Sequence, residues 1–118
     1  MVYGNSNDRI KKQEMERFNG KLVRIYEIHG DLAERLCYMR VKRAFTKEDK
    51  PDDVVLDGII VSFELNKNTG RLLVDTKKAS TYKSFAEYEE LQVISESELA
   101  GIAQACFDVA LYKAGVIS

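Results

Sequence analysis

Residues 94–115 carry the longest regular pattern in the chain, because their apolar side chains recur at the spacing of an α-helix. Ser95 followed three residues later by Glu98 matches a capping box, and Lys113 with Gly115 is typical of a helix ending. We therefore predict a long C-terminal helix. Its main apolar face consists of Leu99, Ile102, Ala103, Cys106, Val109 and Ala110.

The apolar surface of this predicted helix is wider than the stripe of an ordinary surface helix, since Ala100, Phe107 and Leu111 extend it around the cylinder. Two explanations fit. Either another part of the chain, such as the first helix or Phe85 and Tyr88, covers these residues, or the same helix of a second copy does. The second explanation predicts a homo-oligomer with its interface at Ala100, Phe107 and Leu111.

Four segments rich in β-branched and aromatic residues predict strands that pair as two antiparallel hairpins. Residues 30–32 and 68–70 supply the turns, with Gly70 suited to a left-handed conformation. For residues 31–45 a helix capped by Asp31 with Glu34 is the alternative. The predicted strands are Lys21–Ile28, Arg35–Phe45, Val54–Leu65 and Arg71–Lys77.

A three-residue loop at 30–32 sets the expected register of the first hairpin. Val23 then faces Met39 and Ile25 faces Cys37 on the core side, while Glu27 meets Arg35. We expect Ile59, Val61, Phe63 and Leu65 of the third strand, and Leu72 and Val74 of the fourth, to be buried in the same core.

The remaining segments complete an α+β prediction with no βαβ alternation. A short helix is expected from Asn7 or Asp8 to Phe18, a polar loop at 46–53, and a short fifth strand at 91–94. Asp57-Gly58 predicts a bulge or sharp bend that curls the sheet. We expect residues 1–7 to be a flexible arm and 8–118 to form one domain.

About forty residues, from the hairpin with its early glycine to Tyr88-Glu-Glu-Leu91-Gln-Val-Ile94, resemble the closing half of small SH3-like or Sm-like barrels. The resemblance implies a partial barrel of four to five curled strands. It implies no activity, because folds of this kind host many functions.

Composition indicates a globular chain, with 45% hydrophobic and 31% charged residues among 118. The longest apolar runs are too short to span a bilayer, and residues 1–20 have no apolar segment after their charges. We therefore expect a cytoplasmic protein. Cys37 and Cys106 both lie among apolar residues, which favours reduced core cysteines over a disulfide or a metal pair.

The chain contains no phosphate-binding glycine loop, dinucleotide fingerprint or paired-cysteine zinc spacing. His29 could in principle act as a general base for Cys37 as a nucleophile, but the expected register places Cys37 in the core, away from a histidine at a turn. We therefore expect no catalytic residues, cofactor or metal. A small enzyme with its site at a subunit interface is the alternative.

Charge is unevenly distributed, although the net charge is only −1: five basic and no acidic residues lie in 35–47, followed by five acids in 48–57. One face of the first hairpin is expected to combine guanidinium groups, which pair with phosphates, and tyrosine rings, which stack on bases. The other explanation is a solvated strand face without a ligand. The candidate binding residues are Arg24, Tyr26, Tyr38, Arg40, Lys42 and Arg43.

These observations favour a non-enzymatic binding module that acts as a homo-oligomer and recognises another macromolecule or a small anionic ligand. A small intracellular or phage-type inhibitor or regulator fits this description. The alternative is an RNA, single-strand or nucleotide binder that uses the basic, tyrosine-bearing face.

Overall fold

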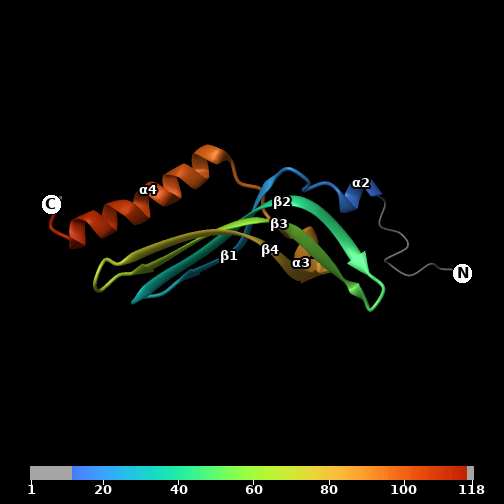
Figure 1. Ribbon diagram of the computed structural model, residues 1–118, viewed down its shortest axis with the longest axis horizontal. Coiled ribbons are helices and arrows are strands. Elements are labelled where there is room, and N and C mark those ends of the chain that lie inside the picture. Colours follow the sequence, from blue (N-terminus) through green and yellow to red (C-terminus); the bar gives the residue numbers. More distant parts are fainter. Residues whose placement is uncertain (1–11, 117–118) are drawn as a thin grey trace, which may run out of the picture.

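The computed structural model describes residues 12–116 and has an α+β fold (Figure 1). One antiparallel sheet with strand order β1-β2-β3-β4 forms its centre, and the sheet is not closed. No helix among residues 12–116 is long and apolar enough to cross a membrane. The elements are α2 (Lys12–Met15), β1 (Leu22–His29), β2 (Ala33–Lys47), β3 (Lys50–Asn66), β4 (Leu72–Ser84), α3 (Phe85–Glu89) and α4 (Glu96–Lys113).

Both faces of the sheet are covered, each over a different half of its length (Figure 1). On the face that we call the α4 face, Leu36, Tyr38 and Phe63 pack with Cys106 of α4. The opposite α3 face buries a second cluster, which consists of Phe18, Val23, Met39, Val41, Ala44, Val54, Leu56 and Tyr88. The sheet arches over this second cluster, with α3 on the inner side of the arch.

Helix α4 begins and ends where its sequence predicts. The Ser95 hydroxyl accepts a hydrogen bond of 3.0 Å from the Glu98 amide. At the other end Gly115 has a φ of 78°, and the Val116 amide donates to the Leu111 carbonyl at 3.0 Å, which is a Schellman ending. The long C-terminal helix is thus confirmed.

A β-bulge in β1 changes the expected register of the first hairpin. Val23 pairs with Met39 as predicted, but Tyr26 rather than Ile25 pairs with Cys37. The extra residue lies between Arg24 and Tyr26, so that Glu27 pairs with Leu36 and not with Arg35. As a result, Glu27 lies on the α4 face beside Tyr38.

The bend predicted at Asp57-Gly58 is present, and it needs a glycine. A Cβ atom at Gly58 would lie 2.1 Å from the backbone oxygen of Arg40, closer than any side chain tolerates. Opposite this position, the register of β2 shifts between Val41 and Arg43, which leaves Lys42 as the extra residue. The predicted bulge therefore lies on the neighbouring strand.

Several element boundaries differ from the sequence prediction. Residues 31–45 are not helical, because β2 begins at Ala33. Most of the loop expected at 46–53 is strand, and β4 continues to Ser84, where the Ser84–Glu87 capping box starts α3. The expected fifth strand is reduced to one bridge between Val93 and Val23. Residues 1–11, with the arm and the start of the first helix, lie outside the described residues.

Candidate functional site

A hollow of about 860 Å³ lies on the α4 face of the sheet where the strands bend, and we call it the bend pocket. It is formed by two neighbouring rows of paired residues that cross β2, β3 and β4. The first row consists of Arg40, Ile59 and Lys78, one residue from each strand. In the second row Asp57 of β3 lies between Arg43 and Ser80.

The floor of the bend pocket is apolar, and backbone is exposed beside it. The Ile59 side chain is 53% exposed, because α4 does not extend over this part of the sheet. Gly58 and Gly20 also line the pocket, so a ligand can approach the main chain closely there. Burial of Ile59 in the core, as the sequence predicted, is therefore wrong.

The rim of the pocket is basic. Lys42 and Lys78 are exposed, and the ammonium group of neither has a hydrogen bond or ion pair within residues 12–116. Arg40 pairs with Glu96 of α4 and donates a 3.3 Å hydrogen bond to the Gly20 carbonyl. Both contacts hold the guanidinium group beside the cavity.

The single carboxylate among the residues that line the pocket is already neutralised. Asp57 accepts hydrogen bonds from the Ser80 hydroxyl and from Arg43 Nε, the latter at 3.2 Å. The Ser80 hydrogen bond, followed by that of Arg43, lowers the pKa of Asp57 below its ordinary value. Four cationic groups therefore surround the pocket, against the two carboxylates Asp57 and Glu96.

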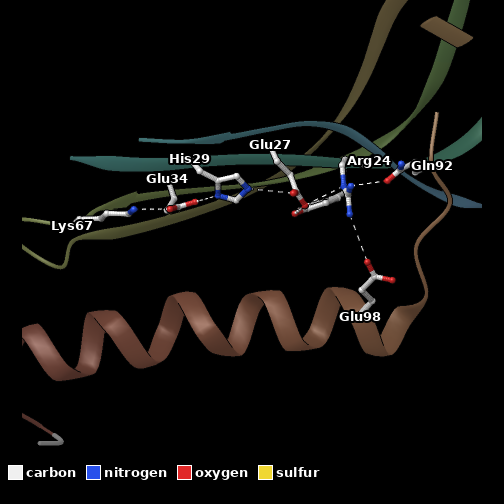
Figure 2. Close-up of polar contacts among 8 residues, drawn as sticks. Arg24, Glu27, His29, Glu34, Lys67, Gln92 and Glu98 are labelled. Carbon is white, nitrogen blue, oxygen red and sulfur yellow. Dashed lines mark hydrogen bonds and ion pairs between the residues drawn. The ribbon is translucent and has the colours of Figure 1, made fainter. Parts of the chain in front are cut away.

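Arg24 and Tyr38, expected in the same basic face, both contact the Glu27 carboxylate instead. Figure 2 shows Arg24 beside Glu27. Tyr38 is 0% exposed, and its hydroxyl donates to Glu27 Oε2 at 2.6 Å. Arg24 Nε lies 3.1 Å from the same carboxylate, and another nitrogen of the guanidinium donates to Gln92 at 2.7 Å. A solvent-facing Tyr38 ring is therefore a wrong prediction, because α4 covers this half of the face.

The polar residues on this half form a ladder of alternating charge along β1 and β2 (Figure 2). His29 lies between Glu34 and Glu27, with Nε2 at 3.3 Å from Glu27 Oε1, and Lys67 Nζ is 2.7 Å from Glu34. The hydrogen bond to Glu34, aided by Glu27, raises the pKa of His29, while the Tyr38 hydrogen bond lowers the pKa of Glu27. The ladder is internally compensated and presents no unpaired charge.

Tyr26 lies apart from the basic residues, on the α3 face opposite Cys37. The six predicted binding residues are thus divided. Arg40 and Lys42 line the bend pocket and Arg43 joins it through Asp57, whereas Arg24, Tyr26 and Tyr38 lie elsewhere. Whether any of them binds a ligand stays a prediction.

Sequence reasoning missed Lys78 and Ser80, the residues that β4 contributes to the bend pocket. The predicted fourth strand ended at Lys77, whereas β4 continues to Ser84. A signal was present, because Lys77 and Lys78 are adjacent and must point to opposite faces of a strand.

The predicted oligomer interface residues lie along the side of α4 that overlooks β4. Ala100 is exposed, Phe107 is 50% exposed and Leu111 is partly buried. Ala100 and Phe107 border an apolar groove whose other wall includes Leu72 and Val74 of β4. These residues are accessible in the single chain, and their role in association stays a prediction.

His29 and Cys37 do not form a catalytic dyad, because they lie on opposite faces of the sheet. Burial also raises the pKa of the Cys37 thiol, which makes it a poorer nucleophile. Within residues 12–116, no three His, Cys, Asp or Glu side chains gather closely enough to hold a metal ion.

Comparison with known proteins gives no relative. No family model, no curated protein and no solved structure matches the chain. The geometry of the bend pocket is therefore the main guide to function.

Proposed function

We propose that the protein is a non-enzymatic binding module whose bend pocket holds a small anionic ligand. The observation that carries this proposal is the pair Lys42 and Lys78, which lack partners within residues 12–116 and lie with Arg40 around one cavity. Like charges gathered at one place raise the local concentration of anions and repel one another when no anion is bound. Binding of an anion removes that repulsion.

The shape and lining of the pocket favour a phosphate ester with an apolar or aromatic part, such as a nucleotide. Its volume of about 860 Å³ falls in the range of small-molecule sites, which is about 300–1,000 Å³. Lysine ammonium and arginine guanidinium groups suit phosphate oxygens, and the exposed Ile59 side chain suits a flat apolar group.

Recognition of a single nucleic-acid strand is less well supported than recognition of a small ligand. Binding of a single strand uses aromatic rings on which successive bases stack. Tyr38 is buried and Tyr26 lies on the opposite face of the sheet, so neither stands beside the basic residues. Recognition of another macromolecule through the same pocket is the alternative proposal, and the experiment below distinguishes the two.

Isothermal titration at low salt tests the proposal, with pyrophosphate, ATP and a short single-stranded oligonucleotide as separate ligands. We expect Lys42→Ala and Lys78→Ala each to weaken binding of pyrophosphate and ATP by about fivefold or more. This estimate follows because two unit charges 4 Å apart attract by about 1 kcal/mol even in bulk water.

Lys113→Ala is the matched control, because Lys113 is an exposed lysine in the last turn of α4 and does not line the bend pocket. It removes the same charge without touching the pocket, so its affinity should match that of the unmodified protein. Equal losses for Lys113→Ala and Lys78→Ala would indicate only a general charge effect and refute the site. Tighter binding of the oligonucleotide than of ATP would favour the nucleic-acid alternative.

A further inference from the structure

Strand β4 leaves an open edge on the sheet. The strand order places β1 and β4 at the two edges, and residues 92–94 shield β1 through hydrogen bonds of 2.9 Å from the Arg24 amide to Gln92 and from the Ile94 amide to Leu22. No segment of residues 12–116 pairs with the outer side of β4. Its 13 residues contain no proline, and its register with β3 is unbroken, so neither a proline nor a bulge blunts this edge, and charged side chains such as Lys77 are its protection.

Apolar side chains flank this edge on both faces of the sheet. Val74 is 55% exposed and lies on the α4 face, where it borders a groove of about 590 Å³ together with Phe107 and Leu72. Leu73 is 49% exposed on the α3 face. An open edge with apolar residues on each side is a surface that a strand of another chain can cover.

We propose that the partner of this edge is a second copy of the protein, whose β4 pairs antiparallel with the first about a two-fold axis through Thr76. A two-fold axis perpendicular to a sheet requires one residue to face its own copy, so only a few registers are available. The charges of the residues that face each other distinguish these registers.

An axis at Asp75, Lys77 or Lys78 places equal charges directly opposite each other, which is destabilising. An axis at residue 74 opposes Arg71 to Lys77. The axis at Thr76 instead opposes Asp75 to Lys77 of the second copy, and the symmetry makes this favourable pair twice. Asp75 of the second copy thereby neutralises Lys77, which would otherwise protect the edge.

An axis at Ala79 is the other one that opposes two opposite charges within β4, since it opposes Asp75 to Lys83. It is less favourable for two reasons. Ala79 pairs with Gly58 at the bend, and Leu73 would face Phe85, which belongs to α3 and not to a strand. The Thr76 register pairs residues 72–80 throughout, all of them within β4.

The Thr76 register joins the two predicted surfaces of the molecule. A perpendicular axis keeps both α4 helices on the same face, so the groove bordered by Ala100 and Phe107 opens toward the second copy. The same register opposes Val74 of the second copy to Lys78, at the rim of the bend pocket. Each copy thereby adds an apolar wall to the pocket of the other.

Disulfide trapping tests this register in the full chain. Cys37 and Cys106 are buried, so an introduced cysteine is the accessible thiol. We expect Thr76→Cys to cross-link to its own copy on mild oxidation, because directly opposed Cα atoms lie about 4.5–5.5 Å apart, within the range of a disulfide. Lys78→Cys is the control, since its two copies would lie about 14 Å apart along the strands.

Dimer bands for Thr76→Cys alone on a non-reducing gel support the proposal. Cross-linking of Ala79→Cys in preference to Thr76→Cys, or of no variant at micromolar protein, overturns it.

Sedimentation of charge variants gives an independent test. Lys77→Asp should weaken the dimer by about fivefold or more, and the double change Asp75→Lys with Lys77→Asp should restore it. Failure of the double change to recover affinity also rejects the register.

Discussion

Replacing Tyr38 by Phe removes one hydroxyl from the buried centre of the charge ladder and leaves the ring in place. The Tyr38 side chain is 0% exposed, so the change creates neither a large cavity nor a new exposed surface. It deletes the 2.6 Å hydrogen bond that the hydroxyl donates to Glu27. The carboxylate keeps Arg24 at 3.1 Å and His29 at 3.3 Å.

The expected cost follows from these contacts. A hydrogen bond to a charged group contributes about 1.5–3 kcal/mol. Because Glu27 retains two cationic neighbours and part of its side chain reaches water, we expect a loss near the lower end, about 1–2 kcal/mol in the free energy of unfolding.

The cost should depend on pH in a defined direction. The Tyr38 hydrogen bond is the largest cause that lowers the pKa of Glu27 below 4.5 in the folded protein. A carboxyl group with a lowered folded pKa stabilises the fold above its unfolded pKa, and this contribution is lost as pH falls through the folded pKa. Tyr38→Phe should therefore cost most near neutral pH and progressively less in acid.

Urea unfolding of the two proteins at about pH 7 and about pH 3 measures the effect. Tyr26→Phe is the matched control, since Tyr26 is partly exposed on the opposite face and has no hydrogen bond of its hydroxyl within residues 12–116. A cost for Tyr38→Phe that equals the control, or that stays constant between the two pH values, would refute the role given to this hydrogen bond.

Two further changes test the bend and the end of the ladder. Gly58→Ala should lower the free energy of unfolding by about 1–3 kcal/mol in urea, because its Cβ would lie 2.1 Å from the Arg40 oxygen; Gly101→Ala, where a Cβ meets no atom, should be neutral or stabilising, and equal losses would contradict this explanation. His29 has a pKa raised above 6.5 by Glu34, so its contribution is full below its unfolded pKa and is lost as pH rises through the folded value. His29→Gln should remove that decline from a stability profile measured between about pH 5 and about pH 9, and an unchanged profile would show that the ladder does not stabilise the fold.

Local signals predicted much of the fold. The caps of α4, the turn at Gly70 and the bend at Gly58 each depend on neighbouring residues, and each is present. The alternation of β2 was also correct, since Tyr38 and Met39 point to opposite faces. Such features need no knowledge of the rest of the chain.

Which parts of the sheet are exposed to solvent was harder to predict. Arginines beside Tyr38 made its face look exposed, but α4 covers half of that face and turns Arg24 and Glu27 into an internal pair. The bulge after Arg24, which decides this register, has no distinctive sequence signal. Lys78 was missed because strand length depends on pairing with β3 and not on β4 alone.

The most direct test of the proposed function is to locate the ligand by amide chemical shifts. A titration of isotope-labelled protein with pyrophosphate at low salt should move the amide signals of Gly20, Gly58 and Ser80, which line the bend pocket. The signals of Gly30 and Gly115, at the first hairpin turn and the end of α4, should stay in place. Saturating shifts confined to the pocket are the predicted result. Shifts centred on His29 or Tyr26, or none at millimolar pyrophosphate, would contradict an anion-binding bend pocket.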